Sequence, residues 1–230
     1  MLRNIEFTVL KAKEIDKVEN FNLEFSSISY YYFLKLRKTQ IASCPYIKIR
    51  ITNEKSEAPI IYQATEGILF IVSSFDFTHY LELSHLKKLK FQYEMMYSIL
   101  KEAFIHYEVN WRILDEINNE LADNNWQMKY KFLKKKIEKA KEFNLIIYMD
   151  IDAFTFVGDI IENGKKREIE IFKSIPTYFA VDYLFKRYRF FDNKVRIGSK
   201  EKAVFELDLD TRIVKVVDTD NKMLNKLRFK

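Results

Sequence analysis

The chain has 230 residues, of which 48% are hydrophobic and 31% charged, a composition typical of a globular protein with a substantial core. Its four glycines are too scattered to form the clustered glycine loops with which Rossmann and P-loop proteins bind phosphates. A single cysteine, Cys44, excludes an internal disulfide and a cysteine-ligated zinc site. We therefore expect a reducing compartment and no cofactor.

Basic residues outnumber acidic residues by 39 to 33, but the last nine residues contain four basic residues and no acid. The rest of the chain is thus close to neutral, whereas nucleic-acid binders usually concentrate positive charge on one face. Charges stand at the N-terminus where a signal peptide is apolar, and no apolar run approaches the roughly 18 residues of a membrane span. These features predict a cytoplasmic protein without a membrane partner.

Residues 1–76 show the alternation of apolar and polar residues that is typical of half-buried strands. The alternating sets are Ile5, Phe7 and Val9; Phe21, Leu23 and Phe25; and Ile47, Ile49 and Ile51. The run Gly67–Val72 is apolar enough to be a central strand. We expect a mostly antiparallel N-terminal sheet of four or five strands.

From about Thr78 to Tyr107 the apolar residues recur every three or four positions, which predicts a long helix. Two further helical stretches follow, one through Ile113, Ile117 and Leu121 and one through Trp126, Tyr130, Leu133 and Ile137. The last of these stretches has seven lysines between Lys129 and Lys141. The sequence therefore predicts two or three central helices, including a lysine-rich helix at residues 126–142.

The alternating pattern returns at Leu145 and runs to Ala153. Glu162-Asn163-Gly164-Lys165 predicts a tight hairpin turn, and Pro176 suits the first turn of a short helix through Leu184. Phe205, Leu207 and Leu209 predict a strand that a turn at residues 210–212 joins to a returning strand. The order of sheet, helices and hairpins favours an α+β fold. We expect one domain, 1–230, with subdomains 1–142 and 143–230 as the alternative.

Two pairs of carboxylates are candidates for metal-dependent phosphoryl transfer. Asp150 and Asp152 flank one residue of a predicted strand, and Asp208 and Asp210 alternate with apolar residues in the same way. Side chains two positions apart on a strand share a face, and paired carboxylates can hold divalent cations. Convergence of the two pairs would support an enzyme, whereas separate solvent-exposed pairs would be structural.

Histidines and the cysteine offer weaker signals. Glu82 with His85 and Glu102 with His106 each supply at most two metal ligands, so we expect no metal site. Cys44 precedes a proline and has no adjacent base that would mark it as a nucleophile.

Aromatic residues make up 16% of the chain, and the seven between Tyr178 and Phe191 exceed what the inner face of one short helix can hold, so some must reach the surface. Exposed tyrosines are effective anchors of protein interfaces, although a chain-wide bias towards Phe and Tyr explains the content equally well. The candidate partner-binding residues are Tyr30, Tyr32, Tyr178, Tyr183, Tyr188, Lys134 and Lys135.

The absence of a cofactor loop or a catalytic set favours a protein-binding module that sequesters or inhibits a partner, in the manner of an immunity protein or antitoxin. The basic balance would suit a protein partner with an acidic surface. The alternatives are a metal-dependent phosphoryl-transfer or nuclease-like enzyme that uses the strand carboxylates, and nucleic-acid binding through the lysine-rich helix. The oligomeric state is not indicated.

Overall fold

The structure is a computed structural model that describes residues 1–11, 15–39, 43–52, 60–63, 66–74, 76–138 and 141–229. The chain forms two compact units, Met1–Met128 and Lys129–Lys230, referred to below as the N-terminal and C-terminal units. Residue 143, the boundary of the two-subdomain alternative, lies inside a strand of the C-terminal unit. Within the described residues, every helix is too short or too polar to cross a membrane.

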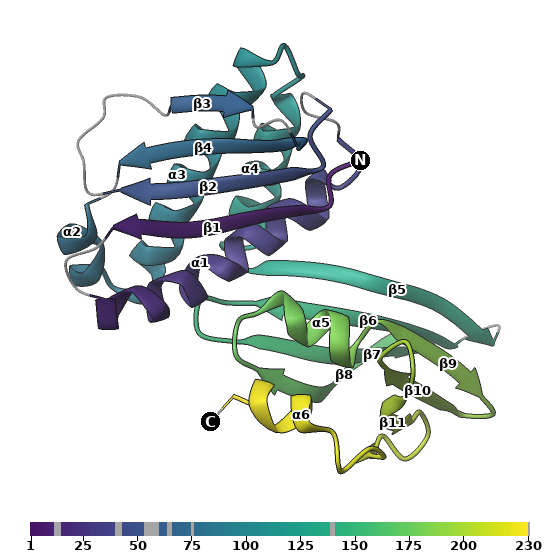
Figure 1. The fold of residues 1–230 in the computed structure, drawn as a ribbon. Coiled ribbons are helices and arrows are strands. Elements are labelled where there is room, and N and C mark those ends of the chain that lie inside the picture. Colours follow the sequence, from purple (N-terminus) through teal and green to yellow (C-terminus); the bar gives the residue numbers. More distant parts are fainter. Residues whose placement is uncertain are drawn as a thin grey trace. The chain divides into compact units, whose positions relative to one another are not determined.

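The N-terminal unit contains a four-stranded sheet in the order β1-β2-β4-β3 (Figure 1). Its strands are β1 (Asn4–Lys11), β2 (Tyr46–Thr52), β3 (Ile60–Gln63) and β4 (Ile68–Ser74). β2 pairs in parallel with both β1 and β4, and only β3 is antiparallel to its neighbour. The prediction of a mostly antiparallel sheet was therefore wrong. A helix connects β1 to β2 and returns the chain so that both strands run in one direction.

That connection is helix α1, Ile15–Leu36, where the sequence predicted a strand around Phe21, Leu23 and Phe25. Phe21 and Phe25 are buried, as are Ile28 and Tyr32, whereas Leu23 is 37% exposed. Burial thus recurs every three or four residues, which is the period of a helix. The prediction failed because three apolar residues at alternate positions fit both a strand and part of a broad helical stripe.

The predicted central helices are confirmed for two of the three stretches. The long helix predicted from Thr78 to Tyr107 is divided into α2 (Phe77–Glu82) and α3 (His85–His106) by extended backbone at Leu83–Ser84, and the second stretch forms α4 (Arg112–Asp123). α1 packs against β1, and α3 packs against β4, α1 and α4. Figure 1 shows α3 and α4 behind the sheet. Helices therefore cover one face of the sheet, and the buried residues of β1, β2 and β4 lie on that face.

The third predicted helix is a strand, β5 (Met128–Glu138). It belongs to an antiparallel sheet in the order β5-β6-β7-β8, with β6 (Lys141–Met149), β7 (Phe154–Glu162) and β8 (Lys165–Ser174). Tyr130 and Phe132 have ring centroids 5.2 Å apart, as expected for residues that share one face of a strand. Lysines alternate with apolar residues at 128–132, and pairing with β6 selects that period over the helical one. Lys139 lies outside the described residues.

The predicted hairpin turn at Asn163-Gly164 is confirmed and joins β7 to β8. Both residues have positive φ, 50° and 76°, which is the conformation that a two-residue hairpin turn requires. The short helix α5 (Tyr178–Leu184) is also confirmed, although its N-cap is Thr177, so Pro176 precedes the helix.

A second antiparallel sheet follows in the order β12-β11-β10-β9. Its strands are β9 (Arg187–Phe191), β10 (Lys194–Gly198), β11 (Ala203–Asp208) and β12 (Val214–Val216). A last helix, α6 (Lys222–Leu227), packs against α5. A Cβ atom at Gly158 of β7 would meet side chains of Phe143 and Leu207, so the two sheets approach closely there. The fold is α+β, as predicted.

Candidate functional site

The β9–β10 hairpin exposes a row of arginines. Arg189 lies directly opposite Arg196, and Arg187 lies on the same face of β9, two residues earlier. Arg196 in turn lies opposite Glu206 of β11. Like charges that face each other across strands are destabilising, so Arg189 beside Arg196 is a pairing that sheet stability alone does not favour.

The loop Ser199–Lys202 borders this face of the hairpin and is held by short-range hydrogen bonds. The backbone N–H of Ser199 donates to the Lys202 carbonyl at 2.9 Å, and the Ser199 hydroxyl accepts from the N–H groups of Glu201 and Lys202 at 3.2 Å each. Gly198 allows the close approach, because an added Cβ would lie 2.1 Å from the Lys202 carbonyl oxygen. The loop therefore holds Lys200 and Lys202 beside the hairpin.

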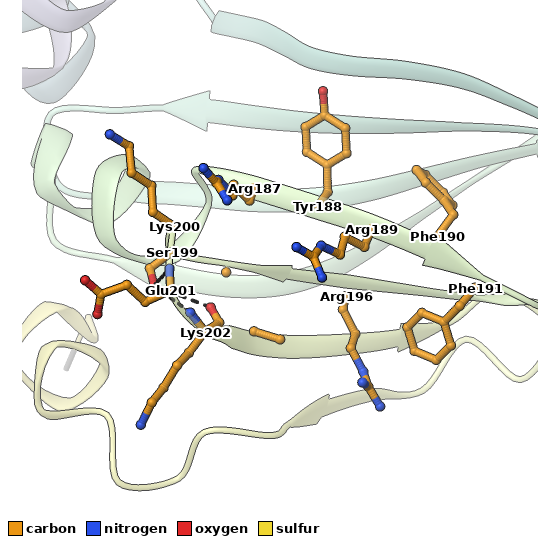
Figure 2. A pocket seen from close by; sticks show the side chains of 12 residues that line it. Arg187, Tyr188, Arg189, Phe190, Phe191, Arg196, Ser199, Lys200, Glu201 and Lys202 are labelled. Atoms are coloured by element: carbon orange, nitrogen blue, oxygen red, sulfur yellow. Dashed lines mark hydrogen bonds between the residues drawn. The ribbon is translucent and has the colours of Figure 1, made fainter.

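The hairpin and the loop together enclose a surface hollow of about 370 Å³, called here the basic hollow. Figure 2 shows Arg187 of β9 next to the Ser199–Lys202 loop, the Lys200 and Lys202 side chains projecting in opposite directions, and the ring of Tyr188 projecting away from Arg189 and Arg196. The cationic side chains that line the basic hollow are those of Arg187, Arg189, Arg196, Lys200 and Lys202, and the only acid among its lining residues is Glu201.

Within the described part of the chain, Arg196 is the one cation of the hollow that pairs with a close carboxylate. The Nε of Arg196 donates to Glu206 at 2.8 Å, and Lys194 donates to the same carboxylate at 3.1 Å. The two hydrogen bonds, first that of Arg196, lower the pKa of Glu206. Among the described residues, no ion pair involves any of the other four cations, Arg187, Arg189, Lys200 and Lys202. The basic hollow thus carries uncompensated positive charge.

A second hollow adjoins the basic hollow and shares Ser199, Lys200 and Glu201 with it. Its other side is formed by Asp182, Tyr183 and Lys186 of the α5 region, and Lys186 pairs with Asp182 at 2.5 Å. The Tyr183 side chain is 47% exposed. The two hollows therefore form one continuous surface, on which the hairpin side is basic and the α5 side holds two lysines, Lys186 and Lys200, and two acids, Asp182 and Glu201.

The predicted partner-binding tyrosines differ in how much of each side chain is exposed. Tyr183 and Tyr188 are exposed and line the two hollows. Tyr32 is fully buried in α1, where its hydroxyl donates to Asn118, so it is not a surface anchor. Tyr30 and Tyr178 are half-buried.

Lys134 and Lys135 are exposed on β5 rather than on a helix. Lys134 pairs with Glu142 at 3.2 Å, and the Lys135 ammonium lies 5.9 Å from the ring centroid of Phe190 in β9. The predicted lysine-rich helix is thus a strand whose described lysines are partly neutralised. The stronger basic feature lies in the β9–β10 hairpin.

The structure does not bring the two carboxylate pairs together. β6 ends at Met149, and Asp150 and Asp152 lie in the following turn, in which the Asp150 N–H donates to the Ala153 carbonyl. Asp210 forms an ion pair at 2.7 Å with Lys141, at the opposite end of β6. Strand length places the pairs about 30 Å apart, at 3.3 Å per residue.

The Asp208 side chain stabilises a turn rather than forming part of a catalytic site. Its Oδ1 accepts hydrogen bonds from the N–H groups of Asp210 and Thr211, and the hydrogen bond of Thr211 is the main cause that lowers the pKa of Asp208. Within the part of the chain that the structure describes, no three His, Cys, Asp or Glu side chains are grouped closely enough to hold a metal ion.

Sequence reasoning missed the hairpin that carries the site. A signal was present, because Arg187-Tyr188-Arg189-Phe190-Phe191 alternates basic and aromatic residues before Asp192-Asn193. Asp and Asn adopt positive φ more readily than most residues, and Asp192 has a φ of 49°. A turn predicted there would have placed the arginines on one face of a hairpin.

Comparisons with models of protein families, with curated proteins and with solved structures found no match for this chain.

Proposed function

We propose that the protein binds nucleic acid through the C-terminal unit, with Arg187, Arg189, Lys200 and Lys202 as phosphate contacts. The observation that carries this proposal is that these four cations line one hollow without ion pairs among the described residues. Keeping like charges together without counter-charges costs stability, and phosphate groups would relieve that repulsion. Arginines and aromatic rings in one surface are also common in nucleic-acid interfaces.

The distribution of charge between the units supports the same proposal. Lys129–Lys230 contains 24 Lys and Arg against 16 Asp and Glu, a net charge of +8. Met1–Met128 contains 15 against 17, a net charge of −2, and the two values add to the +6 of the whole chain. Four of the basic residues of the C-terminal unit lie in residues 222–230, so residues 129–221 carry 20 Lys and Arg against 16 Asp and Glu, a net charge of +4. The near-neutral charge inferred from the sequence combined this value with the −2 of the N-terminal unit. A field of one sign steers an oppositely charged polymer towards the C-terminal unit.

The test is fluorescence anisotropy with the full chain and a labelled oligonucleotide at several salt concentrations. We expect the double variant Arg187→Ala/Arg189→Ala to bind at least about tenfold more weakly. The plot of log affinity against log salt concentration should also become less steep by about 1.4, because two phosphate contacts are lost. The matched control is Lys165→Ala/Arg167→Ala, which removes two exposed charges from β8 outside the hollow.

The control should bind nearly as tightly as the unchanged protein. Equal losses in the two double variants would mean that net charge alone attracts the oligonucleotide, and the site would be wrong. No measurable binding by the unchanged protein at low salt would refute the function itself.

Protein binding, the first expectation from the sequence, is the second candidate, and the edge of the N-terminal sheet favours it. Ile60 and Tyr62 of β3 are 58% and 42% exposed. Tyr62 stacks on Phe70 at 5.6 Å, and Arg50 lies 4.3 Å from the Phe70 ring centroid. Tyrosine and arginine are frequent interface anchors. The test is to compare binding of a protein partner to the unchanged chain and to the variant Ile60→Ser/Tyr62→Ser. Equal binding by both would exclude this edge of the sheet as the protein-binding surface.

A further inference from the structure

We infer that the nucleic acid bound at the basic hollow is single-stranded, with unpaired bases stacked on Tyr183 and on the Phe191–Arg196 pair. This inference rests on the proposed function and specifies the class of its ligand. Three features of the site lead to it: the spacing of the arginines, the position of the aromatic rings and the continuity of the two hollows.

The arginine spacing suits an extended strand. Arg187 and Arg189 are two residues apart on β9 and share a face, so their Cα atoms lie about 7 Å apart. Successive phosphates of an extended single strand are separated by a similar distance. One strand running along β9 can therefore place a phosphate at each arginine.

The aromatic rings lie where the bases of such a strand would reach. Tyr183 is 47% exposed and lines the second hollow beside Lys200. Phe191 shares the face of Arg189 on β9, and the Arg196 guanidinium lies 4.4 Å from its ring centroid. Bases stack on aromatic rings and on guanidinium planes when they are unpaired. In a duplex the bases are stacked on one another, so these groups would add little.

The continuity of the hollows accommodates a strand longer than one nucleotide. Lys200 belongs to both hollows, so a strand that leaves the arginines passes this cation before it reaches Tyr183. Glu201 also belongs to both hollows; it repels phosphate and can accept a hydrogen bond from a base amino group. The hydrogen bonds of Ser199 hold this loop in place before the ligand binds, which lowers the entropic cost of binding.

The experiment compares a labelled single strand with a hairpin duplex of the same length, using the full chain at one salt concentration. We expect the single strand to bind at least about tenfold more tightly. Tyr183→Leu should weaken single-strand binding about fivefold or more and leave duplex binding unchanged. The matched control is Tyr62→Leu, which removes a ring of similar exposure from the N-terminal unit.

A strand that carries 2-aminopurine provides a readout specific to stacking, because the fluorescence of this base analogue falls when it stacks on a ring. The fall should occur with the unchanged protein and diminish with Tyr183→Leu and with Phe191→Leu. Circular dichroism verifies that each variant is folded.

Equal affinity for duplex and single strand would overturn the inference, as would unchanged single-strand binding by Tyr183→Leu. If Arg187→Ala/Arg189→Ala still loses affinity in that case, the proposed function stands and only the stacking is wrong. If the arginine variant also binds like the unchanged protein, both the inference and the proposed function fail.

Discussion

Gly198 ends β10 where the chain turns into the loop of the basic hollow. A Cβ at this position would lie 2.1 Å from the Lys202 carbonyl oxygen and 2.7 Å from the Ala203 Cα. Both are backbone atoms, so rotation of a side chain cannot relieve the overlap. The register of β10 with β11 shifts at the same residue. The position of Lys200 and Lys202 thus depends on a glycine at position 198, where any side chain would collide with the backbone of the loop.

We expect Gly198→Ala to destabilise the C-terminal unit by about 1–3 kcal/mol, because the backbone must move to admit the methyl group. Nucleic-acid affinity should fall as well, since the loop carries two of the proposed phosphate contacts, Lys200 and Lys202. Chemical denaturation and anisotropy measure the two effects. Lys200→Ala is the comparison: it should weaken binding and leave the free energy of unfolding nearly unchanged. Unaltered stability of Gly198→Ala would contradict the close contact.

At the scale of elements, polar contacts connect α1 to α4 in the N-terminal unit. Tyr32 donates to Asn118 Oδ1 at 2.9 Å, and Lys35 pairs with Glu120 at 2.5 Å. Burial raises the pKa of the Tyr32 hydroxyl far above its ordinary range, so the group remains a neutral donor. These contacts give a buried tyrosine on α1 a structural role.

Tyr32→Phe should therefore lower the free energy of unfolding by about 1 kcal/mol, because the variant keeps the ring and removes one hydrogen bond. Binding of nucleic acid should not change. Tyr62→Phe, in which the ring is 42% exposed, is the control and should be nearly neutral. A loss of binding without a loss of stability in Tyr32→Phe would return this residue to the partner-binding set.

Element assignment from the sequence succeeded where one periodicity dominated. The stripe of α3 continues for six turns, and Asn163-Gly164 meets a local backbone requirement, so both were predictable. α1 and β5 were not, because their apolar residues fit two periods. Pairing of β5 with β6 and packing of α1 on β1 select between those periods, and neither contact is local in the chain.

At the scale of the whole molecule, the two units differ in charge and in their fluorescent residues. Both tryptophans of the chain, Trp111 and Trp126, lie in the N-terminal unit. Tryptophan fluorescence therefore reports on unfolding of that unit, whereas far-UV circular dichroism reports on both. The net charges of −2 and +8 also give the units different roles in the proposed binding.

We expect Gly198→Ala to lower the urea midpoint measured by circular dichroism and to leave the tryptophan midpoint unchanged, because the substitution lies in the other unit. Tyr32→Phe should lower the tryptophan midpoint. Equal shifts of both signals in both variants would show instead that the chain unfolds as a single cooperative domain.

The sequence by itself determined the fold class, the β7–β8 turn and the main helical stripes, because these depend on which local face of each segment is apolar. It did not determine strand direction, the choice between helix and strand at residues 15–36 and 128–138, or the separation of Asp150 from Asp210. The basic hollow depends on Arg189 meeting Arg196 across a hairpin and on a loop closing beside them. Such a site exists only after distant segments pair, so only the tertiary structure decided it.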